Sequence, residues 1–113
     1  MHLERLNQTE SRIVGEVLHA AADGPFFPDW EFHTLFGLYR EEVRAVADAW
    51  PLPVVDPQIV TIAVNNSFNM ILGYPHRKDD VWPEWISVDR PTLNELFNRL
   101  RRRRNENHFE RMM

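Results

Sequence analysis

The chain has 113 residues with a formal net charge of −4, 43% apolar residues, 27% charged residues and no cysteine. This ordinary composition predicts one soluble domain with a single core, and the absence of cysteine excludes a disulfide framework, a thiolate metal site and a cysteine nucleophile. The charged N-terminus lacks an apolar signal region and no stretch approaches the roughly 18 apolar residues of a membrane span, so we expect a cytoplasmic protein without a membrane segment.

Residues 9–22 are predicted to form the first helix. Asn7 or Thr9 can cap it. Asn7 and Glu10 have the spacing of a capping box, with Asn in place of Ser or Thr, and a Gly-Pro pair at 24–25 ends the pattern. Gly15 lies in the middle of this helix, where glycine costs about 1 kcal/mol relative to alanine, so it marks either a close helix approach or a tolerated residue. The apolar face consists of Ile13, Val14, Val17, Leu18 and Ala21.

Residues 30–36 and 39–50 are predicted to form two helices joined by a tight turn. Asp29 is the expected N-cap of the first helix, and Gly37 is expected to adopt a left-handed conformation in the turn. Pro51 ends the second helix because proline cannot continue the hydrogen-bond ladder. The second helix carries an apolar stripe of Val43, Val46, Ala47 and Trp50.

This pair of helices has the pattern of a DNA-binding helix-turn-helix and equally that of a structural helical hairpin. The outward face of the second helix would hold Arg40, Glu41, Arg44 and Asp48. DNA affinity depends on basic groups that neutralise phosphates, and these acids oppose it. The structural hairpin is therefore the favoured interpretation, and the DNA-binding regulator is the alternative.

A metal or hydrolytic site is a third hypothesis. His33 and Asp29 are four residues apart and would share one helix face. They supply two of the three or four ligands that a zinc site needs, and no two histidines have the spacing of common zinc sites. We therefore predict no metal site, no cofactor and no catalytic residue.

Residues 58–72 are predicted to form a largely buried helix. Asp56 and Pro57 provide a cap and a first-turn proline, and Gly73 ends the run. Residues 59–64 are rich in β-branched side chains, so a strand is the alternative there. A polar cluster within the run either lines a polar pocket or forms a solvated stripe: Asn65, Asn66 and Asn69.

Residues 74–90 are predicted to form a long loop with two prolines and two tryptophans. Aromatic side chains beside acids suit a protein-binding surface, since tryptophan and tyrosine dominate interface hot spots. The alternative is that the aromatic side chains cover the core. The predicted partner-binding residues are Tyr74, Asp79, Asp80, Trp82, Glu84 and Trp85.

The last helix is predicted over residues 92–104, where Thr92 and Glu95 have capping-box spacing. Residues 1–104 would form the domain, and residues 105–113 a frayed tail. The apolar face of the helix consists of Leu93, Leu96, Phe97 and Leu100.

Charge is distributed unevenly along the chain. Residues 1–98 hold 7 Lys and Arg against 15 Asp and Glu, whereas residues 99–113 hold 6 against 2. The basic run either binds an anion or nucleic acid, or simply supplies cations at the C-terminal end of a helix, where the macrodipole favours them. Its members are Arg99, Arg101, Arg102, Arg103 and Arg104.

The sequence thus predicts an all-α protein, a compact bundle of four to five helices with a helix-turn-helix-like hairpin and a long Trp/Pro-rich loop. The favoured function is a non-catalytic protein–protein interaction module. An acidic body suits a basic partner, and an inhibitor or immunity-type protein is one form of such a module. The oligomeric state stays open.

Overall fold

A computed structural model describes residues 3–52 and 56–112, with side chains as far as Arg101 in the last helix. The described residues form helices and connecting turns without a strand, which confirms the all-α prediction. A short 3-10 turn, η1, opens the structure. The elements are η1 (Leu3–Arg5), α1 (Gln8–Asp23), α2 (Asp29–Phe36), α3 (Arg40–Ala49), α4 (Pro57–Gly73), α5 (Trp82–Trp85) and α6 (Arg90–Met112).

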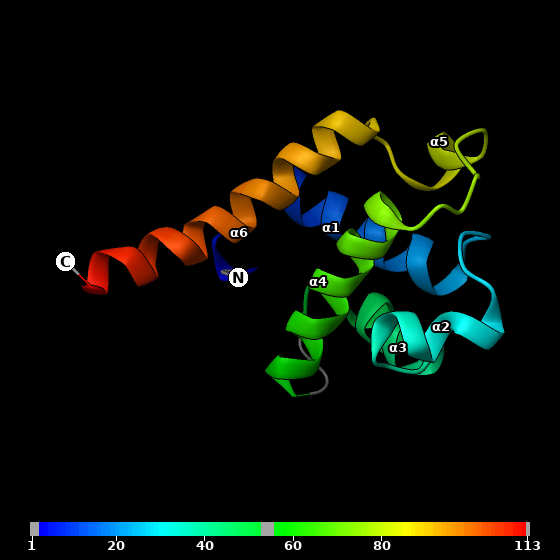
Figure 1. Cartoon of the computed structure of the whole chain (residues 1–113), viewed down its shortest axis with the longest axis horizontal. Helices are drawn as coiled ribbons and strands as arrows, with labels where there is room; N and C mark the ends of the chain where they lie inside the picture. Colours follow the sequence, from blue (N-terminus) through cyan, green and yellow to red (C-terminus); the bar gives the residue numbers. More distant parts are fainter. Residues whose placement is uncertain (1–2, 53–55, 113) are drawn as a thin grey trace.

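The bundle is organised around α1, which packs against α3, α4 and the single turn of α5. Figure 1 shows α2 and α3 together on one side of the body, with α6 on another side and extending beyond the other helices. The largest fully buried side chains come from most of these helices and meet in one core. They include Phe26, Phe32, Phe36, Phe68, Leu18 and Leu93.

Several helix ends follow the chemistry expected from the sequence. The capping box is confirmed, since the Asn7 side chain accepts a hydrogen bond from Glu10 N (2.8 Å) and the Glu10 carboxylate accepts one from Asn7 N (3.1 Å). Asp56 caps α4 through Gln58 N at 2.7 Å. Gly37 ends α2 with a φ of 69°, a backbone conformation that residues with a Cβ rarely adopt.

Two predicted helix starts are wrong. Asp29 is the first residue of α2 rather than its N-cap, which is Pro28, and the Asp29 carboxylate instead pairs with Arg40 at 2.9 Å. The last helix begins at Arg90, because Asp89 accepts a hydrogen bond from Thr92 N (2.9 Å) and takes the capping role assigned to Thr92. The strand alternative for residues 59–64 is also wrong, since all of them lie within α4.

The backbone of α6 is helical through residues 105–112, where the sequence predicted a frayed tail. No glycine or proline follows Pro91, so nothing in the sequence forces the helix to stop at 104. Fraying of this end stays a prediction. No helix among the described residues is both long and apolar enough to cross a bilayer.

Two arginine side chains link neighbouring helices by donating hydrogen bonds to backbone carbonyls at or near the C-terminal ends of those helices. Arg40 donates to the carbonyls of Ala22 (2.8 Å) and Phe27 (2.9 Å), so it holds the end of α1. Arg90 donates in the same way to Leu72 O (3.0 Å) at the end of α4. Each arginine is the first residue of its own helix, and each satisfies carbonyls that a helix end leaves unpaired.

Gly15 lies where α1 and the end of α3 approach closely, so it is not merely a tolerated residue. A Cβ at this position would lie 3.1 Å from Cδ1 of Trp50, which packs across α1 from the end of α3. The Trp50 indole N–H donates to Ser11 O at 2.8 Å and fixes the ring there. The glycine therefore makes room for the tryptophan.

Candidate functional site

The aromatic side chains of the predicted partner-binding loop are built into the body. Trp82 is only 6% exposed, and its indole N–H donates to Val88 O at 2.8 Å. Trp85 is half-buried against the core. The Tyr74 hydroxyl donates to the Glu31 carboxylate at 2.7 Å, and this bond raises the pKa of Tyr74 because deprotonation would lose it.

The loop over residues 74–90 is present, but it contains one turn of helix, Trp82–Trp85, that the sequence did not predict. Of the predicted acidic residues, Asp79 pairs with Arg90 at 2.7 Å, whereas Asp80 and Glu84 are exposed. The acidic side chains therefore face solvent while the two tryptophans pack inward to different degrees. Partner binding by this loop stays a prediction.

His76, which the sequence offered only as part of an incomplete metal site with Asp79 and Asp80, holds the loop to the end of α4. Its ring is buried, with Nε2 3.1 Å from Ile71 O and Nδ1 accepting from Lys78 N at 3.0 Å. These bonds require a neutral ring with its proton on Nε2, because a proton on Nδ1 would oppose the Lys78 N–H. Burial is the main reason that the pKa of His76 lies below its usual value.

We predict that His76 makes folding stability fall in mild acid. Its folded pKa lies below the unfolded value of about 6.5, so the unfolded chain binds a proton first. The stabilisation is complete above about pH 6.5 and is lost progressively as the pH falls toward the folded pKa. Urea unfolding at a series of pH values should show a shallower decline in His76→Gln than in the wild type. His33→Gln, at an exposed histidine, is the control, and equal slopes in wild type and His76→Gln would contradict the assignment.

The described arginines of the basic run have partners within the body. Arg99 lies 3.6 Å from Glu10 of α1. Arg101 donates to Asn98 at 2.7 Å and its guanidinium covers the Phe97 ring at 4.3 Å. The side chains of Arg102, Arg103 and Arg104 lie outside the described residues, so anion or nucleic-acid binding by the run stays a prediction.

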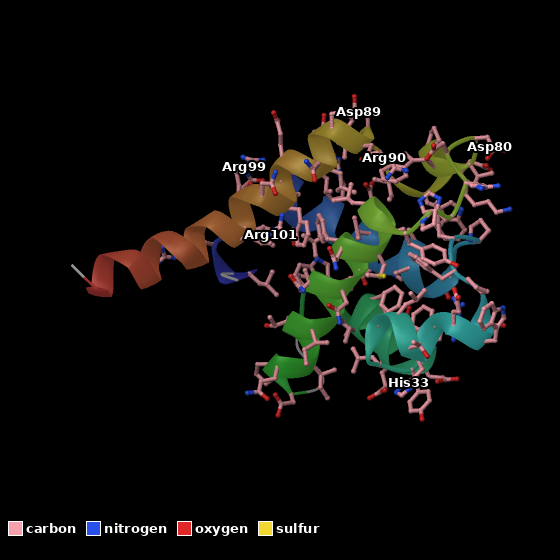
Figure 2. The ribbon with its side chains drawn as sticks, viewed as in Figure 1. His33, Asp80, Asp89, Arg90, Arg99 and Arg101 are labelled. Carbon is pink, nitrogen blue, oxygen red and sulfur yellow. The ribbon has the colours of Figure 1, made fainter. Side chains whose placement is uncertain are left out.

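The candidate site residues do not converge. Figure 2 shows His33, Asp80 and Arg99 on separate parts of the body. His33 and Asp29 also have different partners, since Asp29 pairs with Arg40 and His33 stacks on Tyr39. Among the described residues, no group of three or more histidine, aspartate and glutamate side chains is placed to hold a metal ion.

The asparagines of α4 have ordinary structural partners. Asn66 donates to Phe36 O at 2.7 Å and so caps the end of α2. Asn65 donates to the Asn66 side chain at 3.2 Å, and Asn69 is exposed. These contacts support the solvated-stripe interpretation with one added role, the docking of α2 on α4.

An exposed aromatic surface lies instead on the α2–α3 hairpin, and we call Trp30, His33 and Tyr39 the aromatic face. Trp30 is 80% exposed and Tyr39 is 58% exposed. Trp30 and His33 are one helical turn apart, so their side chains are neighbours on α2. The His33 ring stacks on Tyr39 with centroids 4.1 Å apart and planes 11° apart, which joins the helix to the turn.

The sequence contains a signal for the outward position of Trp30. Phe32 and Phe36 are buried one turn apart, which defines the inward side of α2. At 100° per residue, Trp30 falls about 160° from Phe32 and therefore on the opposite side. The exposure of Tyr39 had no comparable signal, because it precedes α3 and its orientation depends on the turn.

The surroundings of the aromatic face are acidic. Residues 29–42 contain Asp29, Glu31, Glu41 and Glu42 against the single base Arg40, a net charge of −3 with histidine neutral. The Arg40 side chain is 17% exposed, and it both donates to backbone carbonyls and pairs with Asp29 at 2.9 Å, which leaves the other three acids of this segment without a cation from it. A ligand that approaches the aromatic face therefore meets mainly negative charge.

Comparisons with protein families, with curated proteins and with solved structures find no match to this chain. Its function has to be inferred from the arrangement of its own residues.

Proposed function

We propose that this chain is a non-catalytic protein-binding module and that its partner is basic and docks on the aromatic face. The observation that carries the proposal is the exposure of Trp30, a large apolar side chain that most folded proteins would cover. It lies one helical turn from His33, whose ring stacks on Tyr39, so a partner on this side of α2 can reach more than one exposed aromatic ring.

The aromatic face is suited to tight binding because parts of it are already ordered. Tyr39 is held by the stack with His33, and its backbone N–H donates to the Glu42 carboxylate at 2.8 Å. Ordered aromatic side chains lose little conformational entropy on association and are frequent hot spots. The surrounding acids would speed the approach of a basic protein and place its cations over the rings.

An inhibitor or immunity-type protein is the form of module that these features fit best. Such a protein acts by covering a surface of its target, so it needs a rigid patch of complementary charge and no catalytic cleft. The aromatic face supplies the patch and the acids near it supply the charge.

The contacts of α3 weigh against the DNA-binding alternative. Arg40 is committed to carbonyls of the body, and Arg44 donates to Asp23 at 2.7 Å. The other charged residues near them on α3 are Glu41, Glu42 and Asp48, so the helix offers phosphates few free cations.

A quantitative capture experiment tests the proposal. The tagged chain should enrich a basic protein from the cells that produce it, and Trp30→Ala should weaken the purified complex by about 2 kcal/mol or more if Trp30 is a hot spot. Affinity is measured by titration calorimetry with the identified partner. Raising the salt concentration should slow association, because screening removes the electrostatic steering.

Two variants serve as controls. Thr34→Ala changes an exposed residue on α2 next to the aromatic face and should bind normally. Trp85→Ala tests the loop surface that the sequence predicted. A partner that binds Trp30→Ala as tightly as the wild type but loses affinity for Trp85→Ala would move the interface to the loop and refute the proposal.

A further inference from the structure

A pocket of about 570 Å³ opens far from the aromatic face, where η1 and the first turns of α1 and α4 meet the end of α3. The ten residues of α3 separate Trp50 at this pocket from Tyr39 on the aromatic face by about 15 Å along the helix axis. The volume lies within the range of small-molecule sites in proteins.

The walls of the pocket are contributed by elements that hold one another in place. Trp50 forms one wall, and its ring is fixed by the bond to Ser11 O and by its fit over Gly15. Asn7 forms part of another wall and is held by the capping box of α1. A ligand would therefore enter a preformed site, and its binding would cost the protein little conformational entropy.

The chemistry of the lining restricts what the pocket accepts. Most of the described lining is apolar, contributed by Leu3, Leu6, Trp50, Pro51, Pro57 and Val60. The polar remainder consists of the uncharged residues Asn7, Gln8, Ser11 and Thr61. None of the described lining side chains is charged, so they would offer an ion no charged partner in exchange for its lost hydration.

We propose that this pocket binds a small, uncharged and mainly apolar organic molecule that carries one or two hydrogen-bonding groups. The flat indole of Trp50 offers a stacking surface, and the amides and hydroxyls of the polar lining offer hydrogen bonds to the ligand's polar end. The site is independent of the aromatic face, so binding here and partner binding there succeed or fail separately.

The test compares two fluorescent probes that share the same rings. N-phenyl-1-naphthylamine is uncharged, whereas 8-anilinonaphthalene-1-sulfonate carries an additional sulfonate. The wild-type chain should bind the uncharged probe saturably, with energy transfer from tryptophan. It should bind the sulfonate at least about tenfold more weakly, because the described lining residues offer the anion no cation. Absence of saturable binding of the uncharged probe, or equal affinity for both probes, would overturn the proposal.

Substitutions locate the probe. Thr61→Phe fills the pocket from α4, and Gln8→Phe fills it from the first turn of α1. Each substitution should therefore lower the affinity for the uncharged probe by at least about tenfold. Ile62→Phe makes a similar change at the next, exposed position of α4 outside the lining and should bind as the wild type does. Circular dichroism verifies the fold of each variant. Undiminished binding by the correctly folded filling variants would overturn the proposal.

Discussion

Replacing Arg40 with methionine should destabilise the fold by about 3 kcal/mol, because Phe27 O loses its arginine donor and Ala22 O keeps only the longer bond from Arg44 (3.3 Å). The guanidinium donates to Ala22 O and Phe27 O and covers the Phe32 ring at 4.4 Å. Methionine keeps much of the apolar stem and removes the charge and the donors. A buried carbonyl that loses its partner costs about 1–3 kcal/mol. Urea unfolding followed by circular dichroism measures the change, and a loss of 3 kcal/mol would lower Tm by about 12–24 °C.

Arg44→Met is the matched control for this prediction. Arg44 lies one turn further along α3 and also reaches the end of α1, but its side chain is 42% exposed and pairs with an exposed carboxylate of Asp23. The Arg44 guanidinium lowers the pKa of Asp23, yet an exposed pair contributes little to stability because water competes for both charges. Equal effects of the two substitutions would show that Arg40 is only a surface cation.

Trp82→Ala should produce the largest loss of stability, about 3–5 kcal/mol, because it removes a buried aromatic side chain and leaves a cavity. The ring packs edge-to-face on Phe26 with centroids 6.4 Å apart, and the Arg90 guanidinium lies over it at 4.8 Å. The substitution also leaves Val88 O without its indole donor. Differential scanning calorimetry and urea unfolding should both report the loss.

Trp30→Ala is the control, because it makes the same substitution at an exposed tryptophan. Trp30 is 80% exposed, so its removal should change the unfolding free energy by no more than about 0.5 kcal/mol. The contrast separates a tryptophan that stabilises the fold from one that is available to a partner. A large loss of stability in Trp30→Ala would mean that this side chain is needed for folding.

Local chemistry explains why the helices were predictable and why some of their starts were not. Asn7, Asp56 and Gly37 act through residues within four positions of themselves, so their signals are visible in the sequence. The start of α6 was misplaced because two capping signals overlap there, and Asp89 takes the role that the spacing assigned to Thr92. The single turn of α5 escaped prediction because one turn has no helical periodicity.

The candidate site depended on long-range packing and was less predictable. Whether Trp82 covers the core or faces a partner is decided by Phe26, a residue distant in sequence. The inward orientation of Arg40 likewise depends on carbonyls 13 to 18 residues away, which no local pattern reveals. The outward position of Trp30 could have been inferred, because Phe32 and Phe36 recur one turn apart and mark the apolar side of α2 opposite Trp30, but the sequence analysis did not assign it.

Site-directed photocrosslinking tests the central claim, that the aromatic face receives a basic protein, most directly. The photoreactive residue p-benzoylphenylalanine is placed at position 30 in one variant and at position 85 in another, and each variant is irradiated in the cells that produce it. We expect Trp30→p-benzoylphenylalanine to form one dominant covalent adduct with a basic protein, and the variant at position 85 to form little of that adduct. Crosslinking of that partner from position 85 but not from position 30 would contradict the account.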